Sequence, residues 1–162
     1  RIRNACGTIA ILHALANIPT TTTSSPSLSS SPYYGGCIDY FFNSCRSVSS
    51  PIDKAILLEN NKDIERMHHK AATSMMTATD ENNDVDTHFV ALVMSSNRTN
   101  QDKEAVPVLY ELDGRRKNGP IQHGSTTPST FLKDAMKVIQ DDYIRHCTND
   151  IRFSILALVP TS

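Results

Sequence analysis

The first apolar stretch of the chain, GTIAILHALAN at residues 7–17, places hydrophobic residues on nearly every side of a helix. This pattern predicts a helix of about three turns that is buried on most of its sides. Pro19 follows and ends the helix, because proline cannot continue the backbone hydrogen bonds. The prediction therefore places Cys6, the residue just before this stretch, at the helix N-terminus.

Two amphipathic stretches, at residues 37–48 and 50–69, predict further helices. The second begins with Ser50, a favourable N-cap, and Pro51, which suits the first helical position. A pair of asparagines at residues 60–61 is expected to break this helix. The first half of the chain is thus predicted to be helical.

The second half of the chain mixes strands with one helix. Apolar runs at residues 88–94 and 105–114 predict two strands of a hairpin, and residues 118–124 are interpreted as a turn. A helix is predicted over residues 127–147, and a final buried strand over residues 151–159. Helices first, then strands mixed with a helix, indicate an α+β fold with a central, mostly antiparallel β-sheet flanked by helices.

Two segments lack any hydrophobic period. Residues 19–36 are rich in Ser, Thr and Pro and cannot bury enough apolar surface to order themselves, so they are predicted to be a disordered insertion. Residues 70–86 end in acidic and polar positions and are interpreted as a long loop. Long loops within compact domains are uncommon and often cover functional sites, which makes this loop a candidate lid.

Composition narrows the classes of function. A length of 162 residues suits one domain, and a net charge of −1 gives no sign of a nucleic-acid-binding or membrane-surface protein. No apolar run approaches the roughly 18 residues of a membrane span. The four cysteines form no CxxC pair, and this sparse use of thiols indicates a reducing compartment. Cys37, Cys45 and Cys147 lie on apolar helix faces and are interpreted as structural.

Cys6 is the candidate nucleophile. A thiol attacks as the thiolate, and a helix N-terminus favours negative charge through its dipole and its unpaired N–H groups. Gly7 lets a substrate approach the backbone closely, and the N–H groups at this turn can stabilise an oxyanion.

A candidate base and a candidate orienting acid occur downstream. His88 opens an apolar strand directly after the long loop, and Asp113 ends the next strand. In an antiparallel hairpin the start of the first strand lies beside the end of the second, so both side chains are expected at one sheet edge. An imidazole base works best when a third group fixes its tautomer. Each residue alone is more commonly structural, and their convergence with Cys6 is what predicts a Cys-His-Asp triad.

Four ordered blocks, NACGTIAILHALAN, DTHFVALV, LYELDGRRKNGPIQHG and IRFSILAL, resemble the ubiquitin C-terminal hydrolases, which are papain-like cysteine peptidases. The resemblance extends over nearly the whole chain and implies a papain-like fold. It implies that Cys6 is the nucleophile, His88 the general base and later the acid, and Asp113 the residue that orients His88. It also implies that residues 70–86 form the family's crossover loop above the active site.

The reaction implied by this resemblance is thiol-dependent hydrolysis of ester, thioester, amide or peptide bonds at the C-terminal glycine of ubiquitin or a ubiquitin-like modifier. No metal or cofactor is expected, and no nucleic-acid or membrane partner. The expected location is the cytoplasm, with the nucleus as a second compartment. Two alternatives stay open: a catalytically impaired ubiquitin-binding module, and a papain-like cysteine peptidase of another specificity.

The chain departs from the family pattern at its start. The family's oxyanion-hole glutamine lies shortly before the nucleophile, at a position that would precede Arg1. The family domain also begins with strands and helices that have no counterpart in this sequence. Residues 1–162 are therefore expected to be a single hydrolase domain that lacks its N-terminal part and has reduced activity.

Overall fold

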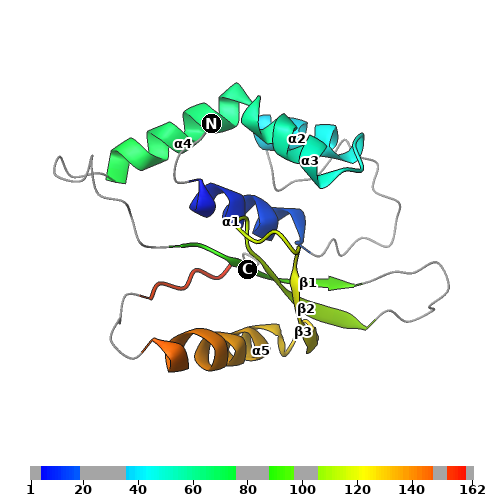
Figure 1. The fold of residues 1–162 in the computed structure, drawn as a ribbon, viewed down its shortest axis with the longest axis vertical. Coiled ribbons are helices and arrows are strands. Elements are labelled where there is room, and N and C mark those ends of the chain that lie inside the picture. The colour runs from blue at the N-terminus through cyan, green and yellow to red at the C-terminus, as the bar shows by residue number, and fades with distance from the viewer. Residues whose placement is uncertain (1–4, 19–35, 76–87, 97–105, 148–152, 160–162) are drawn as a thin grey trace. The chain divides into compact units, whose positions relative to one another are not determined.

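The computed structural model describes five stretches of the chain, residues 5–18, 36–75, 88–96, 106–147 and 153–159. They contain helices in the first half and a small antiparallel sheet with a further helix in the second half (Figure 1). The predicted α+β class is confirmed. None of the helices in these stretches is long and apolar enough to cross a membrane.

The chain divides into two compact units. One consists of Arg1–Thr8 and Thr20–His88, and the other of Ile9–Pro19 and Phe89–Ser162. Helix α1 (Cys6–Ala16) therefore begins in the first unit and continues in the second.

The first unit contains α2 (Cys37–Arg46), α3 (Pro51–Glu59) and α4 (Lys62–Met75), which confirms both amphipathic helices and the break at residues 60–61. The hydroxyl of Ser50 accepts hydrogen bonds from the first N–H groups of α3, as expected of an N-cap. The cap and the break could be predicted from the sequence, because both depend on neighbouring residues only.

The segment predicted as a loop over residues 70–86 is partly helical. Helix α4 continues to Met75, so the first part of the segment predicted as a loop over residues 70–86 is helical. The absence of a clear period after Lys70 was misleading, because Ala71, Ala72 and Met75 are good helix formers. The rest of that loop lies outside the described residues, and so does the predicted insertion, apart from Gly36.

The packing of the first unit centres on two side chains. Phe41 of α2 is 7% exposed and Ile64 of α4 is 1% exposed. Burying such side chains contributes roughly 1.5–3 kcal/mol each relative to leaving them in water. The start of α1 joins this unit through a hydrogen bond of 2.9 Å between Oγ1 of Thr8 and Nδ1 of His68 on α4.

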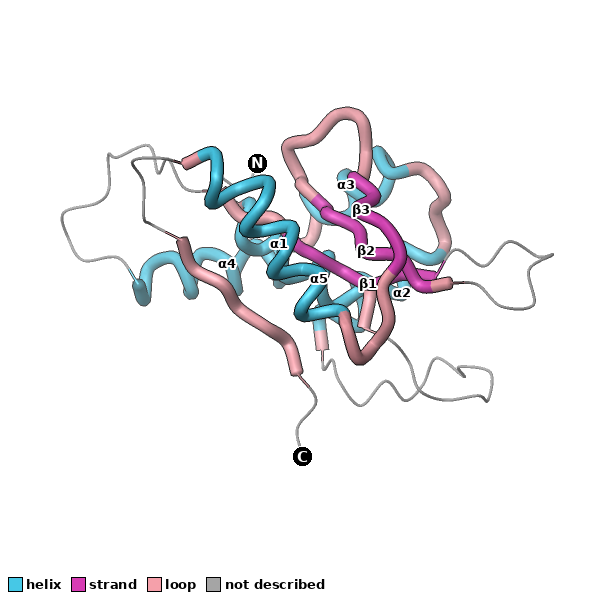
Figure 2. Tube along the Cα trace, turned by 90° about the horizontal axis from the view of Figure 1, so that it is seen from below, coloured by secondary structure: helices cyan, strands magenta, loops and turns pink. Residues whose placement is uncertain are grey.

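The second unit contains the sheet, whose strands are β1 (Ala91–Ser96), β2 (Pro107–Leu112) and β3 (Ile121–Ser125). They lie side by side in the order β1-β2-β3, and both pairs are antiparallel (Figure 2). The predicted hairpin is confirmed, since Ala91 pairs with Leu112 at one end of it.

Strand β3 replaces what the sequence indicated as a turn at residues 118–124. That prediction was wrong because the segment is short and contains Pro120 and Gly124, which favour turns in isolation. Its strand conformation comes from pairing with β2, a tertiary contact that local pattern does not reveal.

Two helical segments cover opposite sides of this sheet, the α1 residues from Ile9 onward and α5 (Phe131–Val138) (Figure 1). The core of the second unit consists of small and branched apolar side chains, namely Leu12, Ala91, Val93, Val108, Leu109 and Ala135. Helix α1 is less buried than predicted: Leu12 is its only buried residue, and Ile11 is 56% exposed.

The predicted helix over residues 127–147 is shorter and irregular at its end. After α5 the chain makes one π-helical turn (Ile139–Tyr143) and one 3-10 turn (Ile144–His146). The predicted buried strand at residues 151–159 is wrong. Residues 153–159 pair with no strand of the described chain and are exposed, with Leu156 at 89%. A continuous apolar run indicates burial only where another layer covers it.

Candidate active site

Cys6 is the first residue of α1 and carries a half-buried, reduced thiol. This position agrees with the prediction that Cys6 lies at the helix N-terminus, and its role as a nucleophile stays a prediction. Thr8, one residue beyond Gly7, fixes this end of the helix through its hydrogen bond to His68. His68 lies within α4 and supports the start of α1 through this bond.

His88 is half-buried and belongs to the same unit as Cys6. It was expected to open the strand, but the ladder begins three residues later, at Ala91. The side chain is thus carried by the segment that leads into β1.

Asp113 directly follows β2 and is held by its own turn. The backbone N–H of Arg115 donates to Oδ1 of Asp113 at 2.8 Å, and the N–H of Arg116 donates to the Asp113 carbonyl oxygen at 3.1 Å. An aspartate that accepts from the backbone two residues ahead is fixed in orientation before any partner is considered.

The turn after Asp113 also packs closely against α1. A Cβ atom at Gly114 would lie 2.9 Å from Cγ2 of Ile9 and 3.4 Å from its Cδ1, so glycine is required for this approach. Ile9 and Gly114 belong to the same unit.

His13 makes a second link between α1 and the end of β2. Its imidazole hydrogen bonds to the backbone of Leu112, and burial lowers the pKa of His13 despite this bond and the nearby carboxylate of Asp113. Within the described chain, its Nδ1 is buried and has no hydrogen-bond partner. The ring therefore donates from Nε2 as a neutral imidazole, and it anchors the residue that precedes Asp113.

The hairpin register confirms part of the expected geometry. Ala91 and Leu112 are paired, so the chain that leads back to His88 and the chain that leads on to Asp113 leave the same end of the strand pair. Cys6 and His88 lie in one compact unit and Asp113 in the other. The assembly of these three residues into a triad stays a prediction.

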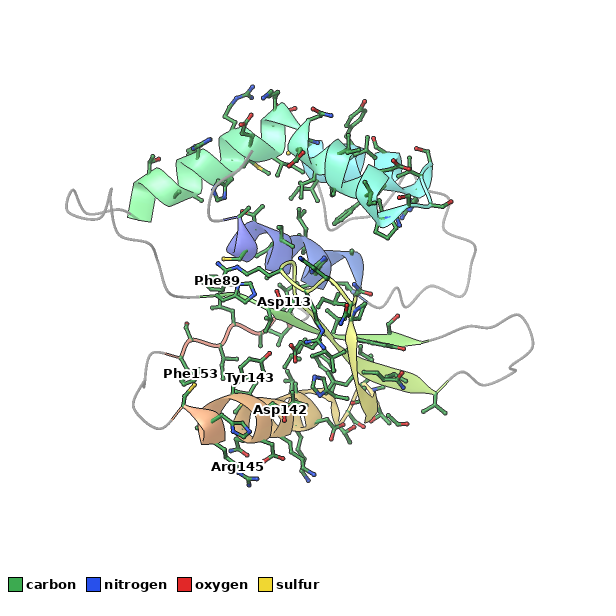
Figure 3. The ribbon with its side chains drawn as sticks, viewed as in Figure 1. Phe89, Asp113, Asp142, Tyr143, Arg145 and Phe153 are labelled. Atoms are coloured by element: carbon green, nitrogen blue, oxygen red, sulfur yellow. The ribbon has the colours of Figure 1, made fainter. Side chains whose placement is uncertain are left out.

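Sequence reasoning missed a buried polar cluster next to Asp113. Nε2 of His123 lies 3.0 Å from Oε2 of Glu111, whose residue is only 5% exposed. Tyr143 also hydrogen bonds to Glu111, and it lies on the sheet side of its helix, whereas Arg145 points away (Figure 3). The signal was weak because His123 falls in the segment interpreted as a turn.

Metal ligation finds no support in the part of the chain that the structure describes. There, no group of three or more His, Cys, Asp or Glu side chains is arranged to hold a metal ion.

Comparison with known proteins identifies the family. The family model for ubiquitin carboxyl-terminal hydrolase, family 1, matches residues 1–144. The chain belongs to this family of ubiquitin carboxyl-terminal hydrolases.

Individual relatives agree with this assignment. Ubiquitin carboxyl-terminal hydrolase 3 of Arabidopsis thaliana is 40% identical over 157 residues, and a ubiquitin carboxyl-terminal hydrolase of Drosophila melanogaster is 34% identical over 155 residues. Ubiquitin carboxyl-terminal hydrolase isozyme L1 of Homo sapiens is 32% identical over 157 residues. These matches cover 96–97% of this chain but only 57–60% of the relatives, so the chain spans little more than half of their length.

Proposed function

We propose that this chain carries the catalytic residues of a thiol-dependent ubiquitin hydrolase, with Cys6, His88 and Asp113 acting together. The observation that supports it most is the match to the hydrolase family over residues 1–144, a range that includes all three residues. The position of Cys6 at the start of α1 supports its role as well, because a helix N-terminus favours the thiolate.

The proposed reaction has two stages. His88 first takes the proton of the Cys6 thiol. The Cys6 thiolate attacks the carbonyl carbon of the C-terminal glycine of ubiquitin or a related modifier, and an oxyanion forms. The bond to the leaving group breaks as His88 gives that group a proton, which leaves a thioester on Cys6. Water then gives a proton to His88 and attacks the thioester. The carboxylate of the modifier and the free enzyme are released.

In this proposal Asp113 orients His88 and stabilises its imidazolium form. The turn that already fixes the Asp113 carboxylate supports this role, because a pre-oriented acid loses little conformational freedom when it binds the imidazole. The tight contact of Gly114 with Ile9 supports it too, since it fixes the backbone next to Asp113.

The segment between α4 and His88 is proposed to act as the crossover loop that limits the size of the leaving group. The proposal is supported by its place in the sequence, directly before the proposed base. Shortening residues 77–84 should raise the hydrolysis rate of a folded-protein adduct of ubiquitin relative to that of a small fluorogenic adduct. An unchanged ratio of the two rates would exclude this role.

The central test uses a ubiquitin derivative with an electrophile, such as a vinyl sulfone, in place of its C-terminal carboxylate. Covalent labelling is expected for the unchanged chain and for Cys45→Ala, and it should disappear for Cys6→Ala. Cys45 is a matched control, because it is also a half-buried thiol and burial raises the pKa of Cys45.

The remaining outcomes separate the alternatives. Binding of ubiquitin without labelling would indicate a binding module. Neither binding nor labelling, together with cleavage of unrelated peptides, would indicate a peptidase of another specificity. Equal loss of labelling in Cys6→Ala and Cys45→Ala would contradict the assignment of the nucleophile.

A further inference from the structure

The buried cluster around Glu111 joins three elements of the second unit. Glu111 of β2 accepts from His123 of β3 at 3.0 Å and hydrogen bonds to Tyr143, which follows α5. The other ring nitrogen of His123, Nδ1, lies 3.5 Å from Oδ2 of Asp142. The proposed reaction uses none of these four side chains.

A β-bulge places His123 in this cluster. Leu109 pairs with Gly124 and Tyr110 pairs with Gln122, so His123 is the extra residue between two regular pairs. A bulge re-aims a side chain that regular alternation would place elsewhere. The φ angle of Gly124 is +118°, a value that L side chains rarely adopt, and this glycine therefore permits the bulge.

The charges in the cluster favour a geometric role for it. The side chain of His123 is only 12% exposed and faces one carboxylate from each ring nitrogen. Such a buried pair adds little net stability compared with apolar residues of the same volume, because the two groups must lose their hydration. The pair instead specifies how β2 and β3 are placed relative to each other, since its hydrogen bonds form at one relative position of the two strands only.

The Glu111–His123 pair lies near the end of β2, where the strand stops pairing with β3. Glu111 is the last residue of β2 that pairs with β3, through Ile121, and Leu112 pairs only with β1. Asp113 is two residues beyond Glu111, directly after the last residue of β2. Burial, the hydrogen bond to Glu111 and the carboxylate of Asp113 all raise the pKa of Tyr143, so this phenol lies near both acids.

We propose that Glu111 and His123 are positioning residues for Asp113: their buried pair locks the end of β2, and so sets the direction from which Asp113 meets His88. This inference rests on the proposed function, because it takes Asp113 as the partner of His88. Tyr143 completes the lock by donating its hydroxyl to Glu111.

The test measures the tautomer of neutral His88 in the full chain, from the 15N chemical shifts of its ring. A carboxylate that binds Nδ1–H holds the ring in that tautomer. Asp113→Asn is expected to reduce the share of the Nδ1–H form, and this change sets the scale. The double variant Glu111→Leu/His123→Leu, which replaces the pair by apolar groups, is expected to produce at least half of that change.

Glu111→Gln is the matched conservative variant. Its amide oxygen can still accept from His123, and its amide N–H can donate to the Tyr143 hydroxyl, so the tautomer of His88 is expected to stay as in the unchanged chain. If the double variant does not fold, Tyr143→Phe gives the same comparison by removing a single hydroxyl that donates to Glu111, with a smaller change in the same direction.

Each contrary result has its own meaning. If Asp113→Asn changes the tautomer and both the double variant and Tyr143→Phe leave it unchanged, the positioning role is overturned and the proposed function stands. If Glu111→Gln changes the tautomer of His88 as much as the double variant does, the change is caused by the lost charge of Glu111 acting at a distance. The inference is then again overturned. If Asp113→Asn has no effect, the pairing of Asp113 with His88 is wrong, and the inference fails with it.

Discussion

Ile9 of α1 occupies the space that a side chain at position 114 would need: a Cβ atom there would lie 2.9 Å from Cγ2 of the isoleucine. This contact joins the helix that begins at Cys6 to the turn that holds Asp113. Because Cγ2 is attached directly to the Cβ of Ile9, it cannot swing away as the end of a long side chain could.

Gly114→Ala is expected to lower the free energy of unfolding by about 1–3 kcal/mol, the usual cost of overpacking. Ile9→Leu moves the branch of the side chain away from the clash, so the double variant Gly114→Ala/Ile9→Leu should recover part of this loss. Urea denaturation of the two single variants and the double variant measures the coupling between the positions. If the changes in the free energy of unfolding of the two single variants simply add up in the double variant, the contact between Ile9 and position 114 is not the cause of the loss.

His13 is expected to make stability depend on pH. Its pKa in the folded chain is lowered from the ordinary value of 6.5, mainly by burial. As the pH falls below about 6.5, the unfolded chain therefore binds a proton that the folded chain does not, and this favours unfolding. The free energy of unfolding should decrease down to the folded-state pKa of His13 and then become independent of this group.

His13→Gln tests this, because glutamine can still donate to the carbonyl of Leu112 but does not titrate. Urea denaturation of both chains between pH 8 and pH 4 is expected to show a weaker loss of stability on acidification in the variant. Curves that stay parallel over the whole range would contradict the assignment of this pH dependence to His13.

Asn61 is expected to contribute to stability through its position before α4. Its Oδ1 accepts from the backbone N–H groups of Asp63 at 3.2 Å and Ile64 at 3.0 Å. Asn61→Ala should therefore cost about 1 kcal/mol in the free energy of unfolding, as loss of an N-cap usually does. Asn60→Ala is the matched control one residue earlier, at the exposed end of α3, and it should cost clearly less. Thermal unfolding of both variants checks the difference, and equal losses would rule out capping as the cause.

Thr126 and Asp134 form a pair with a further pH signature. The buried hydroxyl of Thr126, a residue that is 3% exposed, donates to Oδ2 of Asp134 at 2.7 Å. This hydrogen bond is the largest cause that holds the pKa of Asp134 below its ordinary value of 3.8. A carboxyl group with a lowered pKa stabilises the folded chain above its unfolded-state pKa, and this contribution is lost as the pH falls through the folded-state value.

Thr126→Val is expected to raise the pKa of Asp134 and to lower stability at neutral pH, with a smaller difference from the unchanged chain in acid. An NMR titration of the carboxyl carbon and denaturation at two pH values measure both effects. Ser129→Ala is the control, because its exposed hydroxyl bonds to Thr127. A pKa of Asp134 that responds equally to the two substitutions would show that the cause lies elsewhere.

The sequence predicts those features of this chain that depend on neighbouring residues. The start of α1 at Cys6, the Ser50 cap and the break at residues 60–61 follow from local propensity and capping chemistry. The pairing of Ala91 with Leu112 follows from two apolar runs and a polar connection between them.

Features that depend on distant contacts were not predictable in this way. Strand β3 forms because its backbone pairs with β2. Residues 153–159 are exposed, although their apolar run is typical of a buried strand. Among candidate site residues, Cys6, His88 and Asp113 were predicted because their types are those of a known chemistry. Glu111 and His123 were missed because an apolar strand gives no sign that its one carboxylate is buried, and because a bulge has no dependable local signature.

The bulge at His123 also affects how this short segment should be aligned with related sequences. Residues of β3 before the bulge follow one alternation of sides, and residues after it follow the opposite one. Gln122 and Gly124 face opposite sides of the sheet, because their partners Tyr110 and Leu109 do. Deleting the extra residue between them would therefore remove the bulge and leave every later side chain of the strand on the face that it has now. A gap opposite position 123 in an alignment would mean the loss of the bulge and of His123, with the same interior and exterior positions on either side of it, although it would look like ordinary variation in loop length.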